Sequence, residues 1–183
     1  MQDDATLVAQ AKQGERAAFE QIYDQHRQPI FNYIYFRVGD SELAEDLTSD
    51  VFVRMVDKIG KYTQNGRPLA AWLYTIARNL VIDHHRRDNQ LTWVPLEERL
   101  IEARDYNPDN ETDRNLLQQC LVKALQHLTD EQRQVILLKF VEQRSNADVG
   151  AILGKTEGSI KSLQHRALAA LRRALDKELC YER

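Results

Sequence analysis

The chain has 183 residues, of which 43% are hydrophobic and 29% are charged, and its formal net charge is −3. This composition is typical of a globular protein with one domain or two small ones. The N-terminus lacks the apolar stretch of a signal peptide, and no uncharged apolar run approaches membrane-spanning length. We therefore expect a cytoplasmic protein that does not insert into a membrane.

Apolar residues recur at helical spacing along nearly the whole chain, and no strand-like alternation of useful length is present. Seven glycines and four prolines are few, which favours long helices over turn-rich sheets. We predict an all-α fold. In the first half, one helix is expected over about 6–12, and a second ends at Gly39, with Pro29 as a kink or break. A third runs from the N-cap Ser41 to Gly60, and a fourth covers 68–87.

Charge is distributed unevenly along the chain. Residues 1–90 carry 11 Lys and Arg against 13 Asp and Glu, residues 91–112 carry 2 against 6, and residues 113–183 carry 12 against 9. The middle segment also has two prolines and no helical periodicity. We predict two small helical domains, 1–90 and 113–183, joined by a flexible acidic linker over 91–112.

The end of the chain has the pattern of a helix-turn-helix. One helix is predicted from about Asp113, and residues 129–132 (Thr-Asp-Glu-Gln) resemble a capping box that opens another. Residues 145–148 open a short helix in the same way, which ends at Gly154, and a long helix follows Thr156. Between residues 155 and 173, five side chains are basic and one is acidic, a local charge suited to DNA. A helical hairpin that only packs is the alternative.

The helix predicted over 68–87 has an apolar stripe and a polar flank. Leu73 and Leu80 mark the stripe, in which Trp72 also lies. The flank carries an amide and a carboxylate, Asn79 and Asp83, beside a cluster of arginines. Such groups contact phosphates and base edges, although most polar helix faces are only solvated.

The helix predicted from Ser41 presents an acidic face that includes Asp46, Asp50 and Asp57. This face would repel DNA. It is therefore either solvated or the docking surface of a basic protein partner.

Catalytic and metal-binding functions find little support in the sequence. Residues 83–85 (Asp-His-His) suggest a metal-dependent phosphoesterase, but they lie in a helical pattern beside Arg86 and Arg87, which would repel a metal ion. No glycine-rich elbow or phosphate-binding loop is present. Cys120 and Cys180 lie far apart, so we expect two reduced thiols rather than a zinc site or disulfide framework. No cofactor, metal or catalytic residue is expected.

Five segments closely resemble, in their residues, order and spacing, the extracytoplasmic-function (ECF) sigma factors of bacterial RNA polymerase. They are 11–23 (AKQGERAAFEQIY), 39–52 (GDSELAEDLTSDVF), 70–87 (AAWLYTIARNLVIDHHRR), 125–138 (LQHLTDEQRQVILL) and 150–175 (GAILGKTEGSIKSLQHRALAALRRAL). The resemblance implies sigma regions 2 and 4 in the two domains. It also implies a non-catalytic subunit that binds core polymerase and promoter DNA and opens the minus-ten element.

The resemblance further implies which residues make these contacts. The loop 61–67 and the start of the following helix capture an unstacked base, Asn79 contributes to that contact, and Arg78, Arg86 and Arg87 contact the backbone. The minus-ten set is Tyr62, Asn65, Arg67, Trp72, Arg78, Asn79, Asp83, Arg86 and Arg87. The minus-thirty-five set is Lys155, Thr156, Glu157, Ser159, Lys161, Ser162, His165 and Arg166. The set docking on the polymerase β′ clamp helices is Asp46, Leu47, Asp50 and Phe52. Region 4 is expected to touch the β flap, and an anti-sigma factor is a further expected partner.

Two features depart from the family pattern. Residues 148–150 (Asp-Val-Gly) stand where the first helix of the helix-turn-helix usually carries Glu-Ile-Ala. Gly150 is expected to cost ~1 kcal/mol relative to alanine and to make that helix less rigid. Residues 143–146 are an unusual approach to it. A stand-alone helix-turn-helix regulator, which binds DNA without polymerase, is the alternative function.

Overall fold

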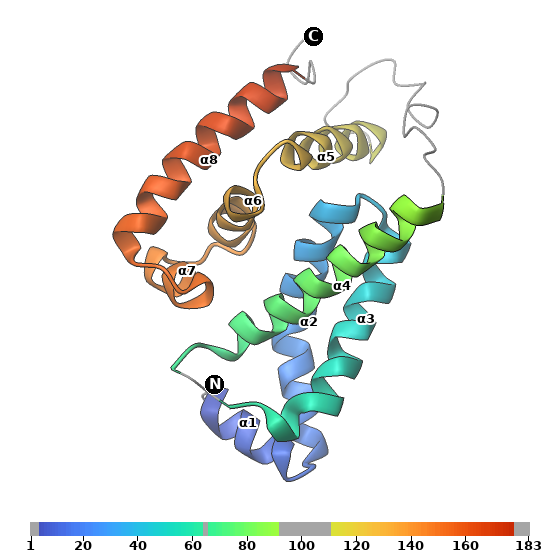
Figure 1. Ribbon diagram of the computed structural model, residues 1–183, viewed down its shortest axis with the longest axis vertical. Coiled ribbons are helices and arrows are strands. Elements are labelled where there is room, and N and C mark those ends of the chain that lie inside the picture. Colours follow the sequence, from blue (N-terminus) through green and yellow to red (C-terminus); the bar gives the residue numbers. More distant parts are fainter. Residues whose placement is uncertain (1–3, 64–65, 92–110, 178–183) are drawn as a thin grey trace.

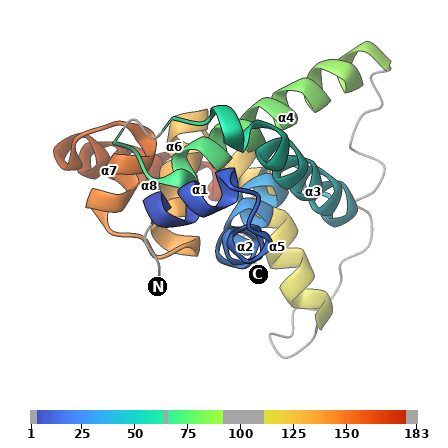
Figure 2. The ribbon, with the colours of Figure 1, turned by 90° about the horizontal axis from the view of Figure 1, so that it is seen from below.

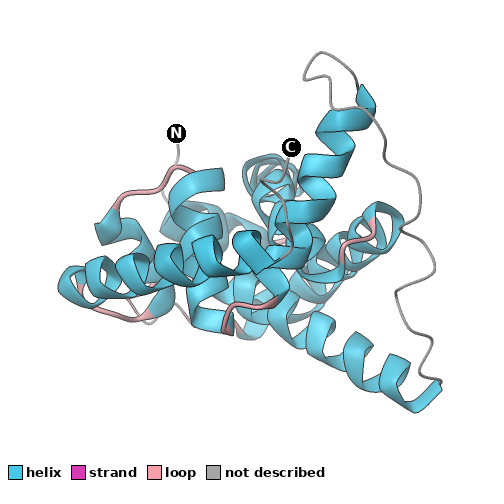
Figure 3. Cartoon of the chain, turned by 90° about the horizontal axis from the view of Figure 1, so that it is seen from above, coloured by secondary structure: helices cyan, strands magenta, loops and turns pink. Residues whose placement is uncertain are grey.

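The computed structural model describes residues 4–63, 66–91 and 111–177. Within these ranges every regular element is a helix and no strand is present, which confirms the all-α prediction (Figure 3). The described helices are α1 (Asp4–Lys12), α2 (Arg16–Val38), α3 (Ser41–Lys58), the 3₁₀ turn η1 (Ile59–Lys61), α4 (Leu69–Leu91), α5 (Glu111–Gln126), α6 (Asp130–Ile136), the π-helical turn η3 (Leu137–Val141), α7 (Asn146–Leu153) and α8 (Glu157–Lys177). None of them is long and apolar enough to cross a membrane.

Helices α1 to α4 form an N-terminal bundle (residues 4–91) in which α2, α3 and α4 pack against one another (Figure 1). The side chains of Ile22, Val51 and Leu73, one from each of these helices, are completely buried between them. The stripe predicted for α4 is confirmed, because Leu73, Ile76 and Leu80 all lie in this core. The C-terminal end of α4 extends beyond the other helices (Figure 2).

The residues expected to end α2 and to start α3 are correct to within one residue. Gly39 adopts the left-handed conformation and ends α2, as expected. The N-cap of α3 is Asp40 rather than Ser41, because the Asp40 carboxylate accepts a hydrogen bond from the Leu43 amide at 2.9 Å. Of the kink or break expected at Pro29, the break is absent: α2 continues through this residue, with Ile30 and Ile34 buried on the far side.

Helices α5 to α8 form a C-terminal bundle (residues 111–177) in which α6 and α7 pack on α8. Both expected capping boxes are present. Thr129 and Gln132 cap α6 reciprocally, and Ser145 and Asp148 cap α7. The Ser145 bonds also hold the pKa of Asp148 below its usual value.

The two bundles are in contact. Helix α2 packs against α5 and η3, and α4 packs against α7 (Figure 1). A Cβ atom added at Gly39 would come within 3.2 Å of the Val122 side chain on α5. The spacing of apolar residues along each helix did not predict this contact between bundles.

Cys120, on α5, is disulfide-bonded, so the expectation of two reduced thiols is wrong for this residue. The other cysteine of the sequence, Cys180, lies outside the described residues. Spatial proximity, not separation in the sequence, decides whether cysteines can pair.

Gly150 lies where α7 approaches the turn that leads into α8. A Cβ atom at this position would lie 2.6 Å from the Lys155 carbonyl oxygen, and the Lys155 amide donates to the Gly150 carbonyl at 2.9 Å. The glycine expected to loosen this helix therefore permits its close contact with the turn.

We predict that Gly150→Ala destabilises the protein by ~1–3 kcal/mol, because the methyl group would push the turn away. Gly158→Ala, in the first turn of α8 with nothing within 4 Å of its Cβ position, should be neutral or stabilising. Chemical denaturation of both variants measures the difference, and equal stabilities would contradict this role of Gly150.

Among the described side chains of the N-terminal bundle, three polar ones are buried: His26, Arg37 and Thr48. Thr48 donates to the Ala44 carbonyl and Arg37 to the Tyr33 carbonyl. His26 Nε2 has no hydrogen-bond partner among the described residues. Burial lowers the pKa of His26 from 6.5, the charge of Asp4 opposes this shift, and that of Arg144 adds to it.

Because His26 binds its proton more weakly in the folded state, the free energy of unfolding should fall as the pH drops below about 6.5. The protonation of His26 can lower the free energy of unfolding by at most ~1.4 kcal/mol per pH unit. His26→Leu should remove it, so urea unfolding at pH 7.5 and pH 5.5 should show a smaller loss of stability on acidification than in the wild type. An unchanged loss would refute the assignment.

Candidate nucleic-acid interface

Two aromatic side chains stack at the start of α4. The rings of Tyr62, which follows η1, and Trp72 are 4.4 Å apart and inclined by 27°, and both residues are half-buried. Burial raises the pKa of the Tyr62 phenol, with Asp4 adding and Arg67 opposing. Asp4 also fixes the start of α4, because its carboxylate accepts from the Leu69 amide at 2.8 Å. The stack is therefore held by α1 and α4 together.

The predicted polar flank of α4 faces outward. The side chains of Arg78, Asn79, Arg86 and Arg87 are exposed, and Asp83 is half-buried. The sequence placed Trp72 both in the apolar stripe and in the minus-ten set. In the structure it is half-buried, neither in the core nor fully exposed, and its ring stacks on that of Tyr62. Asn65, from the same set, lies outside the described residues.

Two exposed arginines of the minus-ten set also contact the C-terminal bundle. The guanidinium of Arg67 donates to the carbonyl oxygens of Ala151 and Ile152 at the end of α7. Arg78 Nε lies 2.9 Å from Asp130 Oδ2 on α6. A cavity of about 250 Å³ lies between the bundles beside these contacts.

The minus-thirty-five set lies around the turn between α7 and α8. The Thr156 hydroxyl accepts from the Ser159 amide, so Thr156 caps α8. Lys155 forms an ion pair of 2.9 Å with Glu131. The remaining predicted residues of the set are exposed along the first half of α8: Glu157, Ser159, Lys161, Ser162, His165 and Arg166.

The acidic docking set divides by burial. Asp46 and Asp50 are exposed on α3, whereas Leu47 and Phe52 are only 7% and 6% exposed. Those two side chains therefore belong to the bundle core and support the acidic face from beneath.

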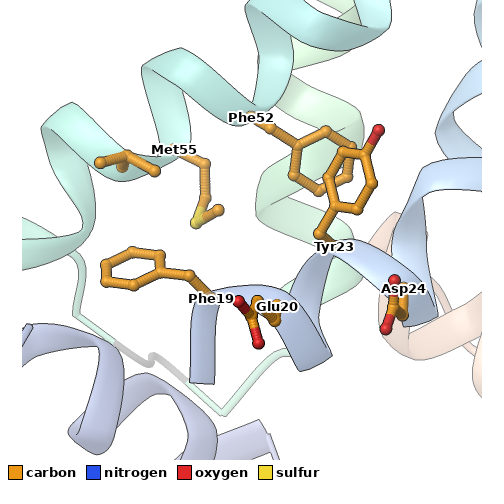
Figure 4. A pocket seen from close by; sticks show the side chains of 7 residues that line it. Phe19, Glu20, Tyr23, Asp24, Phe52 and Met55 are labelled. Atoms are coloured by element: carbon orange, nitrogen blue, oxygen red, sulfur yellow. The ribbon is translucent and has the colours of Figure 1, made fainter. Parts of the chain in front are cut away.

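A groove that the sequence did not predict lies between α2 and α3 (Figure 4). Its volume is about 470 Å³, and the Phe52 ring packs edge-on against Tyr23 at 4.8 Å. The lining residues are Phe19, Glu20, Tyr23, Asp24, Phe52, Met55 and Val56. The only signal in the sequence was Phe19 and Tyr23, one helical turn apart.

The residue that sequence analysis missed most clearly is Asp130. It appeared only as part of a capping sequence, yet its carboxylate bridges Arg37 and Arg78 of the N-terminal bundle. Within the described part of the chain, no group of three or more His, Cys, Asp or Glu could hold a metal ion.

Family models and curated relatives match this arrangement. The models for Sigma-70 region 2 and Sigma-70 region 4 match residues 22–90 and 124–173. The chain is 39% identical over 171 residues to the ECF RNA polymerase sigma factor BldN of Streptomyces coelicolor, which covers 92% of this chain and 64% of that protein. It is 31% identical over 170 residues to the ECF RNA polymerase sigma factor SigL of Mycobacterium tuberculosis, covering 93% of this chain and 96% of that protein.

Two solved structures share the fold over nearly their whole length. CnrH in complex with the cytosolic domain of CnrY is 25% identical, with a TM-score of 0.64 and coverage of 95% and 97%. RpoE in complex with the anti-sigma factor NepR from Bartonella quintana is 26% identical, with a TM-score of 0.58 and coverage of 90% and 98%. Both family models and the near-complete match to SigL thus agree: the chain belongs to the ECF sigma factors of RNA polymerase.

Proposed function

We propose that this sigma factor binds core RNA polymerase, recognises the minus-thirty-five and minus-ten elements of a promoter, and opens the minus-ten element without catalysing a reaction itself. The observation that carries the proposal is the presence, on one chain, of an outward polar flank on α4 and an outward basic and hydroxyl-bearing face on α8. One surface suits an opened strand and the other suits duplex DNA.

For the minus-ten element, we infer that Asn79 receives a base lifted out of the stack. Flipping a base costs a few kcal/mol, which hydrogen bonds from a pocket offset. The amide of Asn79 is exposed and can both donate and accept. Arg86 and Arg87, exposed two turns further along α4, would hold the phosphates of the same strand.

For the minus-thirty-five element, the first half of α8 is the reading surface. Thr156 fixes the start of this helix, and the exposed side chains of Lys161, Ser162 and Arg166 follow it. Lysine and arginine suit phosphates and guanine, and a hydroxyl suits either phosphates or base edges. In this arrangement α7 rests across the backbone while α8 enters the major groove.

For docking, we infer that the exposed Asp46 and Asp50 meet a basic surface on the β′ clamp helices, while the C-terminal bundle touches the β flap. The chain would work in the cytoplasm, with the polymerase. RpoE of Bartonella quintana was solved with an anti-sigma factor, and we infer that an inhibitor of the same kind binds this chain.

Asn79→Ala should reduce promoter opening about tenfold or more and leave core binding intact, because the base pocket loses hydrogen bonds worth ~1–3 kcal/mol. Permanganate footprinting reports strand opening, and gel filtration with core polymerase reports binding. Gln126→Ala, which removes an exposed amide from α5, is the control. Equal losses of opening and of core binding would remove Asn79 from this role.

Asp50→Lys should weaken binding to core polymerase about tenfold, because it reverses a charge in the proposed docking face. Asp176→Lys makes the same charge change at an exposed position on α8 and should bind core like the wild type. Competition against labelled wild-type protein measures both affinities. Identical binding of the two variants would place core docking elsewhere.

A further inference from the structure

Asp130 joins the two bundles through a single carboxylate. Its Oδ1 atom lies 3.1 Å from Arg37 Nη2, and its Oδ2 atom lies 2.9 Å from Arg78 Nε. The two arginines come from α2 and α4 of the N-terminal bundle, whereas Asp130 begins α6 of the C-terminal bundle. Each carboxylate oxygen therefore takes one guanidinium, as a phosphate group does between two arginines.

Arg37 belongs to a prebuilt anion site. Its side chain is 2% exposed, its guanidinium lies 3.6 Å above the centre of the Tyr33 ring, and its Nη1 donates to the Tyr33 carbonyl at 3.1 Å. Asp130 is its only acidic partner among the salt bridges of the described residues. When the bundles separate, Arg37 loses the counter-charge that it has in the closed protein, and its guanidinium becomes available to another anion.

The arrangement of the bundles is incompatible with reading both promoter elements at once. Elements about 25 base pairs apart lie ~85 Å apart along a duplex, at 3.4 Å per base pair. In the structure, Arg67 of the proposed minus-ten reader is hydrogen-bonded to the end of α7 in the helix-turn-helix. Promoter binding therefore requires the bundles to separate and exposes the site that Asp130 fills.

A nucleic-acid phosphate has the chemistry to take that place. Arginine guanidinium groups recognise carboxylate and phosphate through the same paired donors. Arg78 directly precedes Asn79 on α4, so the arginine pair lies next along the helix to the residue proposed to receive the base.

We propose that Arg37 and Arg78 form a binding site for a phosphate of the promoter DNA strand, and that Asp130 occupies this site in the closed protein as a competitor of the DNA. The inference rests on the proposed function of α4 and adds to it a buried arginine that the family resemblance did not indicate. It also makes the C-terminal bundle an internal inhibitor of the N-terminal one.

The test measures binding of the full chain, without polymerase, to a short fluorescein-labelled single-stranded oligonucleotide by anisotropy at several salt concentrations. Asp130→Asn should bind about tenfold more tightly than the wild type, because loss of a charge-assisted contact releases the arginine pair. The salt dependence should become steeper by about 0.7 in log–log slope, the value for one added phosphate contact. Asp176→Asn, an exposed acid of the same bundle, should bind like the wild type.

A second variant assigns the gain to the arginine pair. In Asp130→Asn combined with Arg78→Gln, the gain should disappear, because half of the site is missing. Arg37→Lys keeps the charge at the buried position. Combined with Asp130→Asn, it should remove most of the gain in DNA affinity, provided that the variant still shows an intact unfolding transition. Small-angle scattering should show a larger radius of gyration for the DNA complex than for the free chain.

Equal affinities of the wild type and Asp130→Asn would overturn the proposal, and so would a gain that persists without Arg78. Neither result would affect the proposed sigma function, which the polymerase assays with Asn79→Ala and Asp50→Lys test separately. If the polymerase assays failed but Asp130→Asn bound the oligonucleotide more tightly, the phosphate site controlled by Asp130 would stand. The proposed sigma function would then be wrong.

Discussion

The fold depends on one helix that is buried from several sides. Helix α2 packs against α1, α3 and α4 of its own bundle and against α5 and η3 of the other. Ile22, Ile30 and Ile34 are completely buried on it, and the Tyr33 hydroxyl accepts a hydrogen bond from Gln134 of α6 at 3.0 Å. A helix with this many neighbours needs a continuous regular backbone. This is why α2 runs through Pro29: burial of the residues on either side outweighs the hydrogen bond that proline removes.

Features that depend on contacts within a single helix, such as its buried face and its N-cap, were predicted correctly from the sequence. A repeat of 3.6 residues fixed which side of α4 is buried, and a side-chain oxygen before Gln132 or Asp148 was enough to place the starts of α6 and α7. Features decided between helices were missed. Gly150 looked like a weak point because helix propensity describes an isolated helix, whereas its value lies in contact with the Lys155 carbonyl. The disulfide of Cys120 was missed because separation in the sequence does not decide whether a cysteine pairs.

The candidate site shows the same division. Exposure of Asn79, Arg86 and Arg87 followed from the apolar stripe opposite them, but periodicity could not show that Arg67 and Arg78 point at the other bundle. Their partners lie 84 and 52 residues away in the sequence. The capping sequence already accounted for Asp130 as the first residue of a helix. Nothing in the local sequence indicated that its carboxylate also forms ion pairs with Arg37 and Arg78.

An acidic chain that binds DNA must keep its cationic sites satisfied when DNA is absent. Burial alone raises the pKa of Asp130, but the charges and hydrogen bonds of Arg37 and Arg78 outweigh it and hold that pKa below its ordinary value. The carboxylate therefore stays ionised at neutral pH, and the nearly buried Arg37 keeps a counter-charge from a side chain that is itself 42% exposed. An ion pair between two fully exposed side chains would contribute little to stability. Because one arginine is buried, exchange of the carboxylate for a phosphate preserves the ion pair, whereas simple opening does not. Opening and DNA binding are thereby linked, since the same anion site must be filled in both states.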